Sequence, residues 1–136
     1  MPFSSIKVYG ASGYSGYSGW APGILTATVS SYSPGTVSTD ASLGNSMQVT
    51  VTATGSGTVT LSTPSSPTNG QKFVWSIYNN AASAGVVTIS ASWLKYGNEI
   101  TSITTVANGK TDYLGCIYNT NTGTSGWHLV SYATGY

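Results

Sequence analysis

The chain has 136 residues, only 5% of them charged, and its formal net charge is +1. Ordinary globular domains carry roughly 25% charged residues, so hydroxyl and amide groups must keep this chain soluble. The sequence contains no arginine, and its four lysines are isolated from one another. This pattern excludes the cluster of cations that a duplex-binding protein needs, and we expect no nucleic-acid partner.

Ten tyrosines, four tryptophans and many β-branched residues distinguish the chain from a disordered one, which lacks such side chains. Cys116 and His128 are the single cysteine and histidine, which excludes an internal disulfide and a four-ligand zinc site. No apolar run approaches the roughly 18 residues of a membrane span. Met1–Lys7 lacks the apolar core of a signal peptide. We expect a folded protein that is made in a cytoplasm and has no membrane partner.

Residues 1–23 differ in composition from the rest and predict an N-terminal arm. Gly10, Gly13, Gly16 and Gly19 recur at every third position, the spacing that a collagen triple helix requires. The run is short and has no proline inside it, so a flexible, tyrosine-rich arm that lies across a neighbouring surface is the simpler interpretation. Both interpretations stay open at this stage.

From residue 24 onward, the sequence predicts β structure throughout. Alternating or β-branched runs predict strands at Ile24–Val29, Met47–Thr52, Thr58–Leu61, Phe73–Tyr78, Val86–Ser90, Ile100–Thr104, Tyr113–Tyr118 and Trp127–Tyr132. Gly55–Gly57 is typical of a hairpin turn, and Asn108-Gly109 marks another turn.

About eight short strands without a helical stretch favour a β-sandwich or a jelly-roll-like double sheet over residues 24–136. The all-β fold class therefore follows from the spacing of strands and turns. The residues expected in its core are Ile77, Val87, Ile89, Ile103, Leu114, Ile117, Leu129 and Val130, with Trp75 and Trp127 partly buried.

Few residues in the chain can carry acid–base chemistry. The carboxylates are Asp40, Glu99 and Asp112. A glycosidase needs two carboxylates a few ångströms apart, and Glu99 and Asp112 are the only pair that adjacent strands would bring together. Each of the two follows a turn motif, so solvation or turn bonding explains them better, and Asp112 is expected to bind backbone donors of its own turn.

A Ser-His-Asp triad is formally possible with His128 and Asp112, but the strand–turn–helix context of a nucleophile elbow is missing. His128 stands beside Trp127 and is expected to be a surface or interface residue. Cys116 lies within an expected strand and is predicted to be a small, inert packing residue. We expect no catalytic residue, no cofactor and no metal site.

Aromatic residues are the one surplus of this sequence. Tyrosine and tryptophan are enriched at protein interfaces, and they also stack on sugar rings. Core packing should claim about half of them, and we favour protein contacts over sugar for the rest. The residues predicted to form an interface are Tyr9, Tyr14, Tyr17, Trp20, Trp93, Tyr96, Tyr132 and Tyr136.

The stretch from Gly57 to Tyr136 resembles a module of tailed-bacteriophage structural proteins. The segments that carry the resemblance are Thr58–Leu61, Pro67–Phe73, Trp75–Asn79, Val86–Ile89, Ala107–Tyr113, Ile117–Asn119 and Trp127–Ser131. The tract Gly13–Gly19 also resembles the short collagen-like tracts of phage virion proteins. The resemblance implies a β-sandwich, commonly a homotrimer, located in the virion after synthesis in the bacterial host's cytoplasm.

Within that family, a short chain with an arm suits a head decoration, or cement, protein. Such a protein would bind the major capsid protein at the junctions between capsomers and would act by adhesion alone. The alternative is a tail-fibre tip that recognises host-surface glycans through a shallow aromatic groove. A small carbohydrate-degrading enzyme and an adhesion domain from outside phages also stay open.

Overall fold

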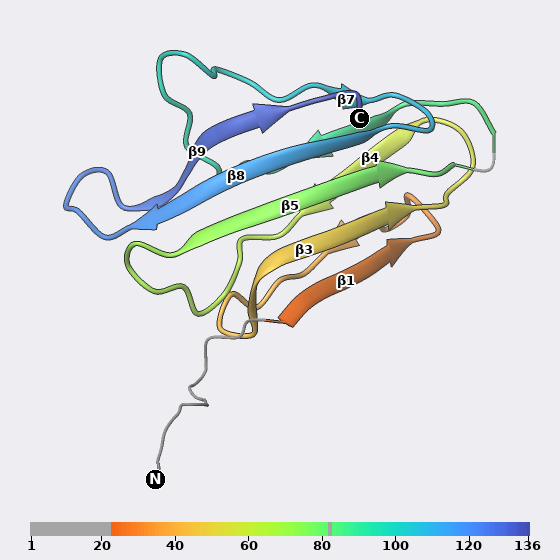
Figure 1. The fold of residues 1–136 in the computed structure, drawn as a ribbon. Helices are drawn as coiled ribbons and strands as arrows, with labels where there is room; N and C mark the ends of the chain where they lie inside the picture. The colour runs from red at the N-terminus through yellow and green to blue at the C-terminus, as the bar shows by residue number, and fades with distance from the viewer. Residues whose placement is uncertain (1–22, 82) are drawn as a thin grey trace, which may run out of the picture.

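The computed structural model describes residues 23–81 and 83–136, and their strands form two sheets that face each other (Figure 1). The five-stranded sheet consists, in spatial order, of β1 (Gly23–Val29), β3 (Gly44–Val51), β5 (Lys72–Asn79), β8 (Thr111–Asn119) and β9 (Gly126–Ala133). The four-stranded sheet consists of β2 (Thr36–Val37), β4 (Gly57–Leu61), β6 (Val87–Ser90) and β7 (Thr105–Val106).

The described residues contain no helix, so none is long and apolar enough to cross a membrane. The expected all-β, sandwich-like double sheet is therefore confirmed. The two interpretations of the glycine repeat concern residues 10–19, which lie outside the described residues.

The strands alternate between the two sheets along the first two thirds of the chain. Because each connection from β1 to β6 crosses to the opposite sheet, β1, β3 and β5 lie parallel to one another, and so do β2, β4 and β6. The antiparallel pairs are β5 with β8, β6 with β7, and β8 with β9. The hairpin expected at Gly55–Gly57 is wrong, since this turn leads from β3 in one sheet to β4 in the other.

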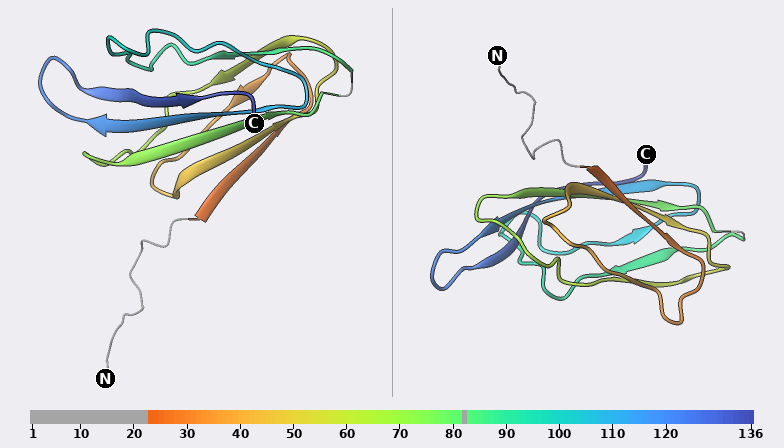
Figure 2. Two further views of the ribbon diagram at one scale, coloured as in Figure 1. Left: turned by 45° about the horizontal axis from the view of Figure 1, so that its top comes forward. Right: turned by 90° about the horizontal axis from the view of Figure 1, so that it is seen from below.

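The turns from β1 to β2 and from β3 to β4 lie together at one end of the sandwich, next to Gly85 (Figure 2). The Tyr32 hydroxyl donates to the Gly55 carbonyl at 3.0 Å, and the Tyr32 ring fills the space where a Cβ at Gly57 would lie. A Cβ at Gly85 would lie 2.4 Å from the Gly55 carbonyl carbon. Glycine is therefore required where these backbones approach most closely.

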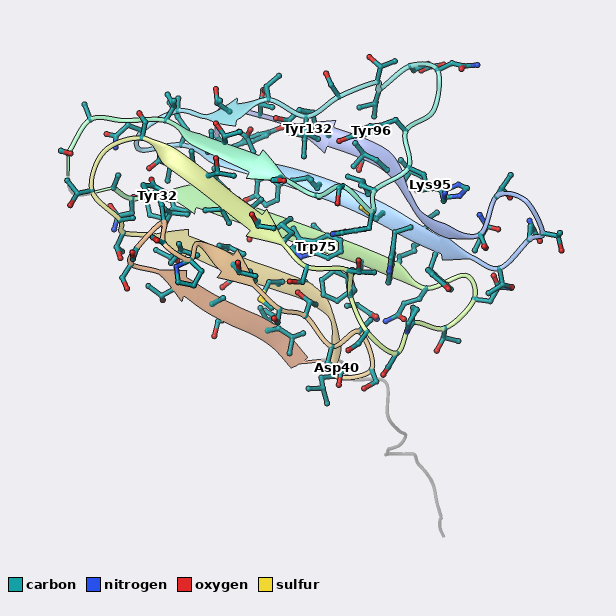
Figure 3. All side chains as sticks on the ribbon, turned by 180° about the vertical axis from the view of Figure 1, so that it is seen from behind. Tyr32, Asp40, Trp75, Lys95, Tyr96 and Tyr132 are labelled. Atoms are coloured by element: carbon teal, nitrogen blue, oxygen red, sulfur yellow. The ribbon has the colours of Figure 1, made fainter. Side chains whose placement is uncertain are left out.

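The core lies between the sheets and follows the alternation of each strand. In β5 the side chains of Phe73, Trp75 and Ile77 are buried, whereas the residues between them are exposed or half-buried. Trp75 occupies the centre of the sandwich (Figure 3), with its ring centroid 4.4 Å from that of Phe73 and 6.2 Å from that of Trp127. Of the predicted core, the buried members are Ile77, Val87, Ile89, Leu114 and Leu129.

The structure corrects three details of this prediction. Trp75 and Trp127 are each only 1% exposed, so they are central rather than partly buried. Val130 is 53% exposed, because the register shift opposite Gly115 and Cys116 leaves it without a partner on β8. Ile103 and Ile117 are half-buried.

The expected strand at Ile100–Thr104 is irregular, and the strand of this region is the shorter β7 beyond it. Thr104 offers its backbone N–H to the Tyr132 hydroxyl at 3.0 Å instead of to a neighbouring strand. The sequence analysis also missed β2, a two-residue strand beside β4.

Candidate interaction surface

The three carboxylates lie in separate places, and two of them, Asp40 and Asp112, have hydrogen-bond partners. Asp40 accepts hydrogen bonds from the Ser42 hydroxyl at 2.7 Å and the Ser42 backbone N–H at 3.0 Å. These bonds stabilise the charged form and hold the pKa of Asp40 below its ordinary value. Glu99 is exposed in the long loop between β6 and β7. Glu99 and Asp112 therefore do not lie on adjacent strands.

Asp112 is buried within β8 rather than bound to its own turn as predicted. Its carboxylate accepts from the Tyr132 hydroxyl and from the Gly135 backbone N–H, each at 3.0 Å. The physical reason is the position of the residue after the turn: β8 has already started at Thr111, so the side chain points inward. Asp112 fastens the C-terminal segment to the sheet.

His128 binds the neighbouring loop and makes no hydrogen bond to a serine or an aspartate among the described residues. Its Nε2 lies 2.6 Å from the Thr124 carbonyl oxygen and 2.8 Å from the Asn119 amide nitrogen. Across residues 23–81 and 83–136, no three His, Cys, Asp or Glu residues gather where they could hold a metal ion. The described acid–base groups thus have structural roles at separate points of the fold.

Cys116 is buried at 2% exposure, and this burial raises its pKa to about 12. We predict that the thiol of the folded protein does not react with Ellman's reagent at pH 8, because the thiolate is the reacting species. The thiol should react stoichiometrically once the chain is unfolded in guanidinium chloride. Fast labelling of the native protein would contradict the assignment of Cys116 as an inert packing residue.

The predicted interface aromatics divide into two kinds. Trp93 and Tyr132 make fold contacts: the Trp93 indole donates to the Leu61 carbonyl at 2.7 Å, and Tyr132 bonds Asp112 and Thr104. Tyr96 and Tyr136 are exposed, at 39% and 70%, on different parts of the surface. Figure 3 shows Tyr96 and Tyr132 near the β9 side of the sandwich. The predicted residues Tyr9, Tyr14, Tyr17 and Trp20 lie outside the described residues.

The structure exposes a larger surface that the sequence analysis did not single out. This surface, here called the outer face, is the side of the five-stranded sheet that points away from the four-stranded sheet (Figure 1). One row across it runs through Thr26, Gln48, Ser76, Tyr113 and Ala133, which are register partners on consecutive strands. Figure 1 looks onto this sheet, and no described segment crosses it.

The outer face gathers most of the exposed large apolar side chains of the described residues. Its members are Ile24, Val74, Tyr78, Tyr113 and Tyr136. Tyr113 and Tyr136 contact each other edge to face, with centroids 5.5 Å apart. Lys72, at one end of β5, is the single formally charged residue at the outward positions of these strands. The outer face is therefore poor in charge and rich in apolar and hydroxyl groups.

A shallow hollow lies within the outer face between Tyr78 and Tyr113. Its other lining residues are Gln48, Val49, Thr50, Ser76 and Thr111. The hollow thus combines two exposed aromatic rings with hydroxyl and amide groups. The signal for it was present in the sequence as tyrosines at the solvated positions of alternating strands, but alternation alone does not show which face of a strand is buried.

No family model, curated protein or solved structure matches the chain.

Proposed function

We propose that the chain is a structural protein of a bacteriophage virion, a decoration protein that binds the major capsid protein through the outer face. The observation that carries this proposal is the concentration of five exposed apolar side chains on one sheet face that carries a single charged residue, Lys72. The resemblance of Gly57–Tyr136 to phage structural modules supplies the context. No catalytic step is part of the proposed role.

The chemistry of the outer face suits adhesion to protein. The centres of protein interfaces are enriched in tyrosine and depleted in charge, because desolvating an unpaired charge is costly. Tyr78, Tyr113 and Val74, each about two fifths exposed, lie near the middle of the sheet on β5 and β8. Thr and Ser side chains around them can satisfy polar groups of the partner. The bound protein would stabilise the shell by mass action.

A matched pair of variants tests the proposal on heads that lack the protein. Val74→Lys places a charge in the outer face, whereas Val86→Lys places the same charge at an equally exposed valine outside the five-stranded sheet, both 41% exposed. We expect Val74→Lys to weaken binding to heads at least about tenfold, roughly 1.4 kcal/mol, and Val86→Lys to leave it unchanged. Cosedimentation of the purified chain with heads gives the affinity.

Immunogold labelling of intact virions locates the wild-type protein. Label over the head supports the decoration role, and label confined to the tail contradicts it. An equal loss of head binding in both lysine variants would show that general charge, rather than the outer face, controls adhesion.

The hollow between Tyr78 and Tyr113 supports a second candidate, a tail-fibre tip that recognises host-surface glycans. Aromatic rings stack on the apolar faces of sugars, and the neighbouring Thr50, Ser76 and Gln48 offer hydroxyl and amide partners. Under this alternative, Tyr113→Ala abolishes binding to host cells or to their purified polysaccharide. Tyr96→Ala, which removes an equally exposed ring elsewhere, leaves that binding intact. Absence of wild-type binding to the polysaccharide would eliminate this candidate.

A further inference from the structure

The two edges of the five-stranded sheet differ in how far they are covered. At the β9 edge, the Lys95 backbone N–H donates to the Trp127 carbonyl, and the Leu129 N–H donates to the Lys95 carbonyl, both at 2.9 Å. Farther along the same edge, Tyr132 bonds Thr104. The loop between β6 and β7 therefore protects β9 from pairing with another strand.

The β1 edge, here called the open edge, is the side of β1 that faces away from β3. The Val29 carbonyl accepts from the Thr52 N–H at 2.9 Å and thus points toward β3. Because backbone groups alternate along a strand, those of Thr26 and Thr28 point away from β3. Among the described residues, none bonds these groups. An unpaired edge of this kind is a template for strand addition.

Beyond the register shift between Gly23 and Ile24, the described residues give the open edge none of the features that natural sheets use against pairing. Ile24–Val29 contains no charged residue and no proline, and its register with β3 is regular. It also has exposed apolar surface beside it, since Ile24 is 62% and Leu43 is 63% exposed. Leu25, Leu43 and Met47 line a groove next to β1, together with Asp40 and with Thr39. The buried Thr39 hydroxyl has no hydrogen-bond partner within residues 23–81 and 83–136.

We infer that the open edge binds β1 of a second copy of this chain, antiparallel and across a two-fold axis. The register that uses the free backbone groups places Thr26 opposite Thr28 of the second copy and puts Ala27 at the axis. Cross-strand Thr–Thr pairs are favourable in antiparallel sheets. Leu25 then faces Val29 of the second copy on the inner side, which extends the apolar layer from one sandwich into the next.

The lack of charge on β1 favours a second copy as the occupant. Residues near a two-fold axis meet their own counterparts, so any charge on β1 would face a like charge, and β1 carries none. A stable dimer buries roughly 800 Å² per partner, which a pair of short strands does not reach alone. Ile24 and Leu43 are therefore expected to contribute to the interface. Two-fold pairing of β1 uses the open edge of both copies and therefore gives a dimer. The phage resemblance implies a trimer instead.

The oligomeric state of the free, full-length chain tests this inference. Light scattering coupled to gel filtration should give twice the chain mass of 14.0 kDa. The double variant Thr26→Lys/Thr28→Lys sets like charges opposite each other across the axis and should elute as a monomer. The matched control Thr58→Lys/Thr88→Lys adds the same charge to register partners of the four-stranded sheet and should stay dimeric.

Three outcomes would overturn the inference. They are a wild-type monomer at about 100 μM, a wild-type trimer, and a Thr26→Lys/Thr28→Lys variant that remains dimeric. If the variant proves unfolded by circular dichroism, amide exchange of the wild type decides instead. The N–H groups of Thr26 and Thr28 should become protected as protein concentration rises, and unchanged exchange would refute the pairing. The result does not depend on the outer-face proposal, which is tested by binding to heads.

Discussion

Trp75→Ala should destabilise the protein by about 3–5 kcal/mol, the range for removing a large buried aromatic side chain. Trp75 is 1% exposed and its ring contacts those of Phe73, Trp93 and Trp127, which belong to different elements on both sides of the core. Removing the indole leaves a cavity that these rings cannot fill without leaving their rotamers. Urea unfolding monitored by far-ultraviolet circular dichroism measures the loss.

Two further variants control for the size and the polarity of the side chain. Tyr136→Ala removes a ring that is 70% exposed and should change the unfolding free energy by less than about 1 kcal/mol. Trp75→Phe should cost less than the alanine variant, because the buried Trp75 Nε1 has no hydrogen-bond partner and its removal relieves a desolvated donor. A Trp75→Ala loss below 1 kcal/mol would contradict the central position of Trp75.

The longer strands were predictable from sequence because alternation is a local property, whereas the two-residue strands β2 and β7 were not. Phe73–Tyr78 alternates between large apolar and more polar residues, and the structure forms β5 there. The assignment of strands to sheets was not predictable in this way. Gly55–Gly57 has the composition of a hairpin turn, but its path to the other sheet depends on packing against Tyr32 and Gly85, which are distant in sequence.

The errors in the predicted core and site have the same non-local origin. Val130 belongs to an apolar run in β9, and only the bulge opposite β8 turns it outward. Asp112 stands beside a turn, yet its partners are Tyr132 and Gly135, on a later segment. Tyr96 and Tyr136, two of the predicted interface residues, are exposed, and their interface role stays a prediction. Tyr78 and Tyr113 became candidates only when the sheet order placed β5 beside β8.

The outer face and the open edge are geometrically compatible. Side chains of β1 alternate between the outer face and the core, whereas its free backbone groups lie in the plane of the sheet. Antiparallel pairing of two β1 strands would therefore join two outer faces into one continuous surface. Such a surface would contain two equivalent outer faces. Once one of them is bound to a repetitive shell, the second is held at a high effective concentration near its own site, which strengthens binding of the dimer.

Asn79→Ala should destabilise the protein by about 2–4 kcal/mol, because it leaves buried backbone groups without partners. The Asn79 side-chain amide donates to the Val106 carbonyl at 2.9 Å and to the Gly85 carbonyl at 3.0 Å, and its oxygen accepts from the Ala81 N–H. The residue itself is 0% exposed. It connects the end of β5 to the approaches of β6 and β7, and so joins the two sheets.

The neighbouring Asn80 supplies the control, since it is exposed and its side chain bonds, among the described residues, only the Tyr78 hydroxyl, at 3.4 Å. Asn80→Ala should change the unfolding free energy by less than about 0.5 kcal/mol. Because Asn79 binds the Gly85 and Val106 carbonyls, its loss should also speed exchange of the backbone amides around these two residues before global unfolding. Equal effects of the two alanine variants would show that the Asn79 bonds do not hold the sheets together. A loss of unfolding free energy in Asn79→Ala but not in Asn80→Ala would show that one buried amide joins the two sheets at this end of the sandwich.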